Sequence, residues 1–425
     1  MAEVVITNIG KLVSGDWNKG LLKENTVLIK ENKIKKIGFE DEINHEKADL
    51  VIDANGMTVV PGFIDPHTHL PIGDYAPMQR MIGVMEESLL QGITTVINEW
   101  EQFEGLPLFY PPDPLGVKAT AILAYKAYKN FRPGGAQKVH GGAIMLVKGL
   151  KEQDFRELAE IGIWRVGQIG GSTDLKRDEI LEMVSWARKY GMFISCNYGP
   201  GVLKHSLPMD LDLVLNIKPD KLAHLNGGTT APSWKEVKNL INKTSMPLEI
   251  IPYGNLKSAV QIANYLKNKG ELHRLLVGSD TPTGQGYMPV AVQRAVIFLS
   301  SVCNIPAEKA IAMATGNTLD LYGKWVNAGK IESGRDADLV IIDTPPGSVG
   351  EDALKAIEAG DTFGVALVMV DGKIVGLRGR DTRPTQKHVK VNGKELCVSD
   401  PNEALFNPPR FHWQSIGETY FINRQ

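Results

Sequence analysis

The sequence predicts an α/β protein, in which a TIM-like (β/α)8 barrel is joined to a small β-sandwich domain formed from both chain ends. Short β-rich runs separated by turns fill the first 60 of the 425 residues. From Pro61 onward, apolar runs alternate with amphipathic segments, as expected for parallel strands joined by crossover helices. The expected domains are residues 1–60 plus 326–380 (small β domain), 61–325 (barrel) and 381–425 (C-terminal extension).

The strands of the small domain are predicted from β-branched residues between turn residues. We expect strands at residues 4–6, 26–30, 33–38 and 50–53, and again within 329–343 and 365–375. In the last of these segments, Asp371-Gly372 is typical of a type I′ hairpin turn. The extension is rich in Arg, Pro and Asn and ends in an aromatic cluster. It is either an arm on a neighbouring subunit or a tail packed on its own small domain.

The barrel is predicted from the spacing of the apolar runs. Successive runs end about 26 to 44 residues apart, which suits repeated strand-plus-helix units. The connecting segments 151–161 and 176–190 have one apolar face each, and Gly191 is suited to end the second helix. The predicted strand ends are His67, Asn98, Ala124, Gln168, Asn197, His224, Tyr253 and Asp280.

Composition excludes several classes of function. The chain is 43% hydrophobic and 23% charged, which is ordinary for a globular protein. A net charge of −2 provides no field that would attract nucleic acid or an anionic membrane. Three cysteines cannot form a disulfide framework, the N-terminal residues do not resemble a secretion signal, and no apolar run approaches the roughly 20 residues of a membrane span. We therefore expect a cytoplasmic protein, and neither nucleic acid nor a membrane is an expected partner.

The clearest candidate site is the segment Pro61-Gly-Phe-Ile-Asp-Pro-His-Thr-His-Leu70. His67 and His69 end an apolar run, and side chains two residues apart in a strand point to the same side, about 6–7 Å apart. Such a pair can hold one divalent metal ion, although two incidental polar residues would give the same pattern. The abrupt change from apolar to polar residues favours the metal.

Two further strand ends carry groups suited to chemistry. Active sites of TIM-like barrels lie at the carboxyl ends of the strands. Asp280 closes an apolar run in which an unpaired buried carboxylate would be costly, so we expect it to bind metal or act in catalysis. His224 is followed by Leu-Asn-Gly-Gly and is either a structural histidine or part of the site.

A cationic cluster follows the predicted end of the third strand. It contains Lys126, Tyr128, Lys129 and Arg132, which would suit an anionic group of a substrate, such as a ring carboxylate. A solvated loop or a contact between subunits would explain the same residues.

The sequence resembles the amidohydrolase superfamily. The resemblance is carried by residues 61–69, the Gly92-Ile-Thr-Thr-Val96 run, the strand end at Asp280 and segment 334–340. Within the superfamily the chain looks like the enamidase branch, on segments 126–134, 140–143, 217–228, 314–317 and 344–349. The resemblance extends to about residue 380, and the final 40 or so residues have no place in it.

This resemblance implies a metal site with two unusual positions. Related two-metal sites hold one ion with the HxH pair and the last-strand Asp, and a second with histidines on strands five and six. A carboxylate on strand four bridges the ions. Here the bridging position is Gln168 and the strand-five position is Asn197. A neutral amide is a poor ligand and cannot offset the repulsion of two dications. We expect a mononuclear His67, His69 and Asp280 site, with Gln168 as a weak ligand or an orienting group.

The resemblance implies a metal-dependent hydrolase that cleaves a C–N bond in a small cyclic amide such as a lactam, an imide or an enamide-like heterocycle. Zinc is the expected metal, with iron or manganese as alternatives, and the family suggests a homo-oligomer, a tetramer. Asp280 would transfer the proton of water to the leaving nitrogen, and His224 would stabilise the oxyanion. The expected substrate-binding residues are Asn197, Lys126, Tyr128, Arg132 and His140.

Two other functions are compatible with the altered site. One is a metal-assisted lyase, hydratase or decarboxylase on the same fold. The other is a non-catalytic amidohydrolase-like chain, which the retention of His67, His69, His224 and Asp280 disfavours.

Overall fold

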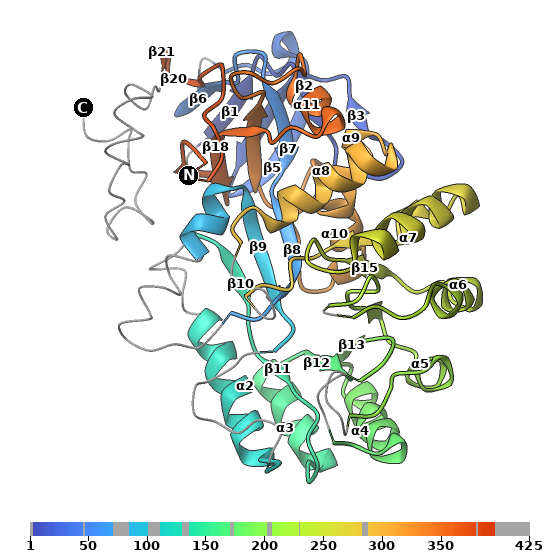
Figure 1. Ribbon diagram of the computed structural model, residues 1–425. Helices are drawn as coiled ribbons and strands as arrows, with labels where there is room; N and C mark the ends of the chain where they lie inside the picture. The colour runs from blue at the N-terminus through green and yellow to red at the C-terminus, as the bar shows by residue number, and fades with distance from the viewer. Residues whose placement is uncertain are drawn as a thin grey trace.

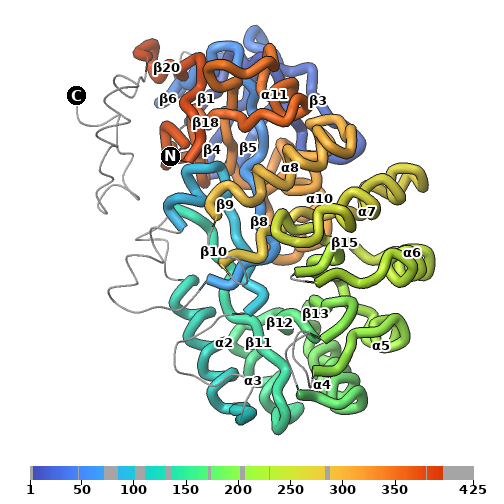
Figure 2. Tube along the Cα trace, in the orientation of Figure 1, coloured from blue at the N-terminus to red at the C-terminus, as the bar shows by residue number. Residues whose placement is uncertain are grey.

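The computed structural model shows a mixed α/β protein in which strands from both chain ends lie together (Figures 1 and 2). These strands occupy the upper part of Figure 1, and the parallel strands with most of the helices lie below them. The structure describes residues 3–45, 47–70, 85–100, 111–129, 136–170, 174–201, 206–228, 230–282, 288–379 and 381–395.

The terminal strands form two six-stranded sheets, with orders β21-β20-β6-β1-β4-β5 and β19-β18-β17-β7-β2-β3. One buried cluster contains Ile6 and Val27 from the first sheet and Val59 and Ile341 from the second, so the sheets share a core. The strands are β1 Glu3–Thr7, β2 Lys11–Val13, β3 Leu21–Leu22, β4 Thr26–Lys30, β5 Lys33–Gly38, β6 Leu50–Asp53, β7 Thr58–Pro61, β17 Leu339–Asp343, β18 Gly364–Val370, β19 Lys373–Gly376, β20 Lys390–Val391 and β21 Lys394–Glu395.

The strands expected at both ends of the chain are confirmed. At the predicted hairpin between β18 and β19, Asp371 and Gly372 have φ angles of 50° and 72°, as a type I′ turn requires. One difference lies in the segment expected to be an extension, because β20 pairs antiparallel with β6 and so continues the first sheet beyond residue 380. The rest of the extension, with its aromatic cluster, lies outside the described residues.

The parallel strands follow one another in sequence order, in sheets β10-β9-β8 and β11-β12-β13-β14-β15-β16. The first strand lies beside the segment that follows the last one, because Thr68 and Thr281 form a parallel bridge. These strands are β8 Phe63–Thr68, β9 Ile93–Asn98, β10 Lys138–His140, β11 Ala143–Ile144, β12 Arg165–Ile169, β13 Phe193–Cys196, β14 Lys221–Leu222, β15 Leu248–Ile250 and β16 Leu275–Val277.

The predicted strand end at Ala124 is wrong. Ala124 lies inside helix α2 (Pro114–Lys129), and the third strand is formed later, by β10 and β11. The run around Ala124 consists mainly of Ala, Leu and Ile after a proline suited to the first helical position, so helix propensity dominates. Gly141 and Gly142 separate β10 from β11 and allow α2 to approach closely. A Cβ at Gly141 would lie 2.2 Å from the Tyr128 ring.

The two predicted connecting helices are confirmed as α3 (Glu152–Ile161) and α4 (Arg177–Lys189), and both bury the expected apolar faces.

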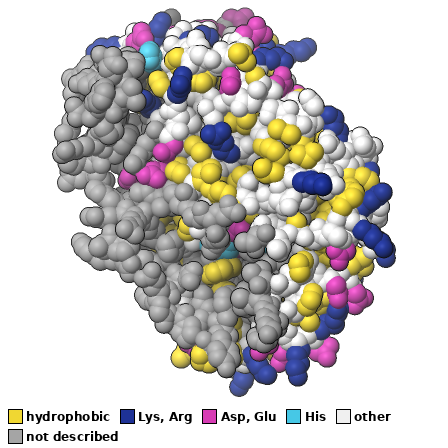
Figure 3. Space-filling model, in the orientation of Figure 1, with side chains coloured by type: hydrophobic (Ala, Val, Ile, Leu, Met, Phe, Trp, Pro, Cys, Tyr) yellow, Lys and Arg dark blue, Asp and Glu magenta, His cyan; other side chains and the backbone are white. Residues whose placement is uncertain are grey.

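None of the described helices is long and apolar enough to cross a membrane. Acidic and basic side chains are interspersed over the described surface in Figure 3. Further described helices are α5 Leu211–Ile217, α6 Trp234–Lys243, α7 Leu256–Lys269, α8 Ala291–Cys303, α9 Ala307–Met313, α10 Gly316–Tyr322 and α11 Ala353–Ala359, with short 3-10 turns at Glu40–Glu42 and Leu272–Arg274.

A cluster of charges joins the parallel strands to the terminal sheets. Lys138 on β10 places its Nζ atom 2.7 Å from Asp336, 2.8 Å from Asp338 and 2.7 Å from Asp371. Burial alone would lower the pKa of Lys138, but the three carboxylates outweigh it and raise the pKa above its usual value. This cluster holds the third strand against the segments before β17 and after β18.

Asp336 should stabilise the fold in a pH-dependent way. Burial raises the pKa of Asp336, but Lys138 and neighbouring hydrogen bonds lower it overall, from 3.8 to about 2. A carboxylate whose pKa is lowered by folding stabilises the fold at pH values above its pKa in the unfolded state. This stabilisation is lost as the pH falls through the pKa of the folded state. We expect Asp336→Asn to reduce the free energy of unfolding by about 2 kcal/mol at pH 7 and by much less near pH 2.

Urea unfolding at pH 7, 4 and 2.5 would measure this difference. The exposed Glu351 provides a matched control, because Glu351→Gln should have little effect at any of these pH values. An Asp336→Asn effect of constant size across the pH range would contradict the expectation.

Candidate active site

Three predicted metal ligands meet where β8 lies beside the chain that follows β16. His67 Nε2 lies 3.1 Å from His69 Nε2. Asp280 Oδ1 lies 3.3 Å from His67 Nε2 and 3.0 Å from His69 Nε2. Both histidines are almost fully buried, and the Asp280 side chain is 18% exposed. Two nitrogen atoms and one carboxylate oxygen thus converge on one point at the edge of the protein interior.

The backbone positions Asp280 for this contact. Its N–H donates to the carbonyl oxygen of His67 at 2.8 Å, and the N–H of His69 donates to Thr281 at 2.8 Å. Asp280 adopts a left-handed φ of 57°, and His224 one of 28°. Residues other than glycine rarely adopt such angles, and these conformations often occur at functional sites. The neighbouring strands therefore hold the Asp280 carboxylate beside both imidazoles.

Gln168, Asn197 and His224 adjoin this triad. Gln168 Oε1 lies 3.1 Å from His67 Nε2. The Nε2 of the same amide lies 2.6 Å from Asn197 Oδ1 and also contacts His224 Nε2. The structure therefore brings together six residues chosen from strand ends in the sequence. The Gln168 oxygen faces the triad. Its amide nitrogen donates to Asn197 and His224, which occupy the positions where related two-metal sites hold the second ion.

The charges of the site are strongly coupled. Burial would raise the pKa of Asp280, but His67 and His69 outweigh it and hold the pKa well below its usual range. Burial would lower the pKa of His67, but Glu249 and Asp280 raise it well above its usual value. For His224, burial is the largest influence and lowers the pKa below its usual value.

Sequence reasoning missed three buried charged residues beneath His67. Glu249 on β15 accepts a hydrogen bond from His67 Nδ1. Lys221 on β14 places Nζ 2.5 Å from Glu249 and 2.5 Å from Glu99, which follows β9. Burial would raise the pKa of Glu249, but His67 and Lys221 lower it to about 2. The available signal was a charged residue within a short apolar strand, as in Leu248–Ile250.

The structure does not bring the residues expected to bind substrate together at one place. Asn197 lies beside the triad, whereas Lys126 is exposed near the end of α2 and Arg132 lies outside the described residues. Tyr128 is buried, with its hydroxyl 3.5 Å from the carbonyl oxygen of Leu70. The cationic cluster therefore does not follow a strand as expected, since the strand assigned before it is a helix.

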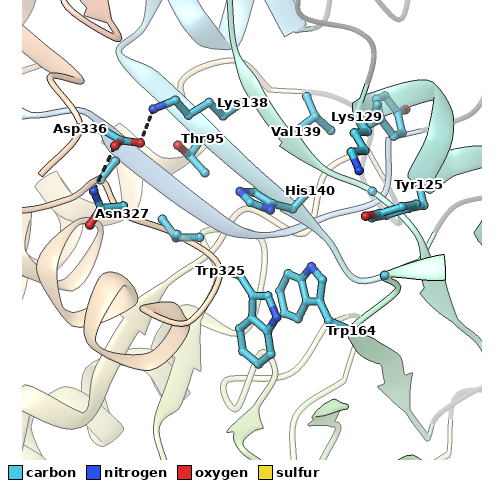
Figure 4. Close-up of a pocket in the computed structure, with 15 residues that line it drawn as sticks. Thr95, Tyr125, Lys129, Lys138, Val139, His140, Trp164, Trp325, Asn327 and Asp336 are labelled. Carbon is cyan, nitrogen blue, oxygen red and sulfur yellow. Dashed lines mark hydrogen bonds and ion pairs between the residues drawn. The ribbon is translucent and has the colours of Figure 1, made fainter. Parts of the chain in front are cut away.

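His140 lies in a different environment from the one expected. Its ring packs edge-on against Trp164, with centroids 6.2 Å apart. Burial, with the nearby charges of Arg165 and Lys138, lowers the pKa of His140 to about 4. His140 and Tyr128 line a cavity of about 410 Å³ between α2, β10 and the Trp164–Trp325 pair (Figure 4). The His140 ring thus packs against this aromatic wall, while its carbonyl oxygen accepts a hydrogen bond from Arg165.

The triad fits a divalent metal better than the other clusters do. Among the described residues, three groups of His, Asp or Glu bring ligand atoms within 4.8 Å of one another. Lys221 already pairs with both carboxylates of the His67, Glu99 and Glu249 group, and Lys138 already pairs with the three aspartates. The His67, His69 and Asp280 group contains no such ammonium, and two imidazoles with a carboxylate form a typical catalytic zinc ligand set.

Comparison with known proteins assigns the family. Two models described as Amidohydrolase family match residues 50–124 and 216–375. The enamidase of Eubacterium barkeri is 40% identical over 393 residues, covering 92% of this chain and 100% of the relative. This chain belongs to the amidohydrolase superfamily. It is an enamidase-like hydrolase of that superfamily, so the family resemblance inferred from the sequence is confirmed.

Solved structures agree with this assignment. The crystal structure of enamidase superimposes on this amidohydrolase with a TM-score of 0.85, covering 92% of this chain and 100% of that chain. Among more distant relatives, imidazolonepropionase of Bacillus cytotoxicus is 23% identical over 417 residues, covering 81% of this chain and 91% of the relative. An amidohydrolase structure at 18% identity has a TM-score of 0.60, covers 88% of this chain and 98% of that chain, and shows the shared fold alone.

Gly278 allows the close packing on which the triad of this amidohydrolase depends. A Cβ added there would lie 2.8 Å from the Cβ of His67 and 3.0 Å from the carboxyl carbon of Glu249. The His67 Cβ is fixed by strand β8, so Gly278→Ala must displace the imidazole or its partner. We expect a loss of about 1–3 kcal/mol in stability, as for other overpacked cores, together with reduced metal content.

Thermal unfolding and elemental analysis would measure both effects. Gly228→Ala is the control, because nothing lies within 4 Å of its added Cβ. Wild-type metal content in Gly278→Ala would show that His67 tolerates the displacement.

Proposed function

We propose that this amidohydrolase is a metal-dependent enzyme that hydrolyses a C–N bond in a small cyclic amide, such as a lactam, an imide or an enamide-like heterocycle. The observation that carries the proposal is the convergence of His67 Nε2, His69 Nε2 and Asp280 Oδ1 within 3.3 Å of one another. The 40% identity to enamidase supports the substrate class.

We infer that strands β8 to β16 close into a (β/α)8 barrel spanning residues 61–325. The parallel order of the strands and the bridge between Thr68 and Thr281 support closure. The two terminal sheets would form the separate β-sandwich domain, extended to at least Glu395 by β21. In such a barrel the triad lies at the carboxyl ends of the strands, where TIM-like enzymes have their active sites.

A divalent ion held by the triad would lower the pKa of a water molecule and polarise the substrate carbonyl. Zinc suits two imidazoles and a carboxylate, and iron or manganese would accept the same ligands. Asp280 is held ionised beside both histidines, so it can accept a proton and deliver it to the leaving nitrogen. This proton transfer accompanies cleavage of the C–N bond.

We infer one ion rather than two from the contacts of Gln168. Its Nε2 lies between Asn197 Oδ1 and His224 Nε2, so an amide N–H group satisfies both atoms that a second ion would use. Its Oε1 points to His67 and is placed to act as a weak ligand or to orient water. Stabilisation of an oxyanion by His224 would require its contact with Gln168 to open. Among the expected substrate-binding residues, Asn197 is linked to the triad through Gln168.

Metal content tests the number of ions. We expect about one equivalent of metal per chain by elemental analysis. The double variant Gln168→Glu with Asn197→His should raise this value towards two, because it supplies a bridging carboxylate and a second imidazole. Each single variant is a control, since one new ligand does not complete the second position.

Two equivalents in the wild-type protein would contradict the single-ion proposal. Absence of metal after metal-supplemented purification would contradict a metal-dependent enzyme.

Product analysis tests the reaction. Over a panel of lactams and imides in H₂¹⁸O, hydrolysis should place ¹⁸O in a newly formed carboxyl group. A lyase or decarboxylase would form its products without that label, and a hydratase would place it in an alcohol. Asp280→Asn should reduce turnover at least 10²-fold, as expected when a general acid–base group is removed. Turnover by Asp280→Asn close to the wild-type rate would contradict its proposed role.

A further inference from the structure

A fully buried network of charges lies directly behind His67. Lys221 pairs with Glu249 and with Glu99, and all three side chains are at most 2% exposed. Removing charged groups from water costs several kcal/mol for each ion unless they are well paired. Such a cluster adds little to stability compared with apolar packing of the same volume, so its position beside a ligand set suggests a functional reason.

The network connects strands on both sides of the triad. Glu249 Oε1 accepts from His67 Nδ1 and from the backbone N–H of His224 at 3.1 Å. Glu249 Oε2 lies 2.5 Å from Lys221 Nζ. Lys221 also donates to the carbonyl oxygen of Pro66 at 3.0 Å, on the same strand as His67. Lys221 therefore contacts the backbone of the first strand, β8, and Glu249 contacts the His67 imidazole on the same strand.

We propose that Glu249 is the positioning residue that makes His67 a metal ligand, and that Lys221 and Glu99 hold Glu249 in place for this task. The inference rests on the proposed function, since it concerns the same metal site. A hydrogen bond from Nδ1 to Glu249 places the imidazole proton on Nδ1. The lone pair of Nε2 then points to the centre of the triad. Carboxylates that contact ligating histidines in this way orient the ring and increase its basicity.

The two histidines of the pair are positioned by different means. His69 Nδ1 is buried without a hydrogen-bond partner among the described residues, and its ring lies against Trp100 with centroids 4.7 Å apart. His67 instead depends on a charged partner. Two carboxylates and one ammonium leave one net negative charge behind His67, which favours a cation at the triad.

The test is the affinity of metal-free protein for Zn²⁺ alone, measured by competition with a chromophoric chelator. Glu249→Leu removes the acceptor and should weaken Zn²⁺ binding by up to about 100-fold. Glu249→Gln keeps an oxygen acceptor for Nδ1–H but loses the charge, so it should weaken binding by about 10-fold. Partial rescue by Gln distinguishes positioning from simple filling of space.

Asp338→Asn and Asp338→Leu are the matched controls. Like Glu249, Asp338 is a buried carboxylate paired with a lysine, here Lys138 at 2.8 Å, but it lies directly before β17. These variants should reduce thermal stability while leaving Zn²⁺ affinity unchanged. If Glu249→Leu fails to fold, the comparison of Glu249→Gln with Asp338→Asn decides the question.

Zn²⁺ affinity of Glu249→Gln equal to that of the wild type, or an equal loss in the Asp338 variants, would overturn the inference. Failure of the wild-type protein to bind Zn²⁺, Fe²⁺ or Mn²⁺ would instead overturn the proposed function, so the two failures are distinguishable.

Discussion

The site depends on the hydrogen bonds that join the first parallel strand to the chain after the last one. The N–H of Asp280 donates to His67, and the N–H of His69 donates to Thr281. These two bonds set the distance between a carboxylate and two imidazoles that are far apart in sequence. They also hold Asp280 in a left-handed conformation that would otherwise be disfavoured. The close approach at Gly278, and the contacts of Gln168 with His67, follow from the same arrangement.

Buried lysines determine where a cation can bind. Lys221 pairs with both carboxylates behind His67, and Lys138 pairs with the three aspartates between the parallel strands and the terminal sheets. Both ammonium groups occupy clusters that would otherwise attract a metal. Gln168 plays a related part with a neutral amide, since its N–H group satisfies Asn197 and His224. The open ligand set is therefore the one formed by His67, His69 and Asp280.

Much of the candidate site could be predicted because parallel strands carry their functional groups at their carboxyl ends. This rule located Gln168, Asn197 and His224 as well as the triad. It could not locate Glu249 or Lys221, which lie within short strands where an apolar pattern suggests packing. It also failed at Ala124, where an alanine-rich run satisfies both a buried strand and a helix until helix propensity is considered. The substrate residues placed after that strand were displaced with it.

By itself the sequence determined the family, several strands at each chain end and the set of polar residues available at the strand ends. Those features arise from local periodicity and from short motifs, which act over a few residues. Only the tertiary structure decided which charged groups are paired and that Glu249 contacts His67. It also decided that the Gln168 amide contacts His67 through its oxygen and Asn197 and His224 through its nitrogen. A buried ion pair forms only when strands distant in the sequence place complementary groups within hydrogen-bonding distance. No local pattern encodes that distance.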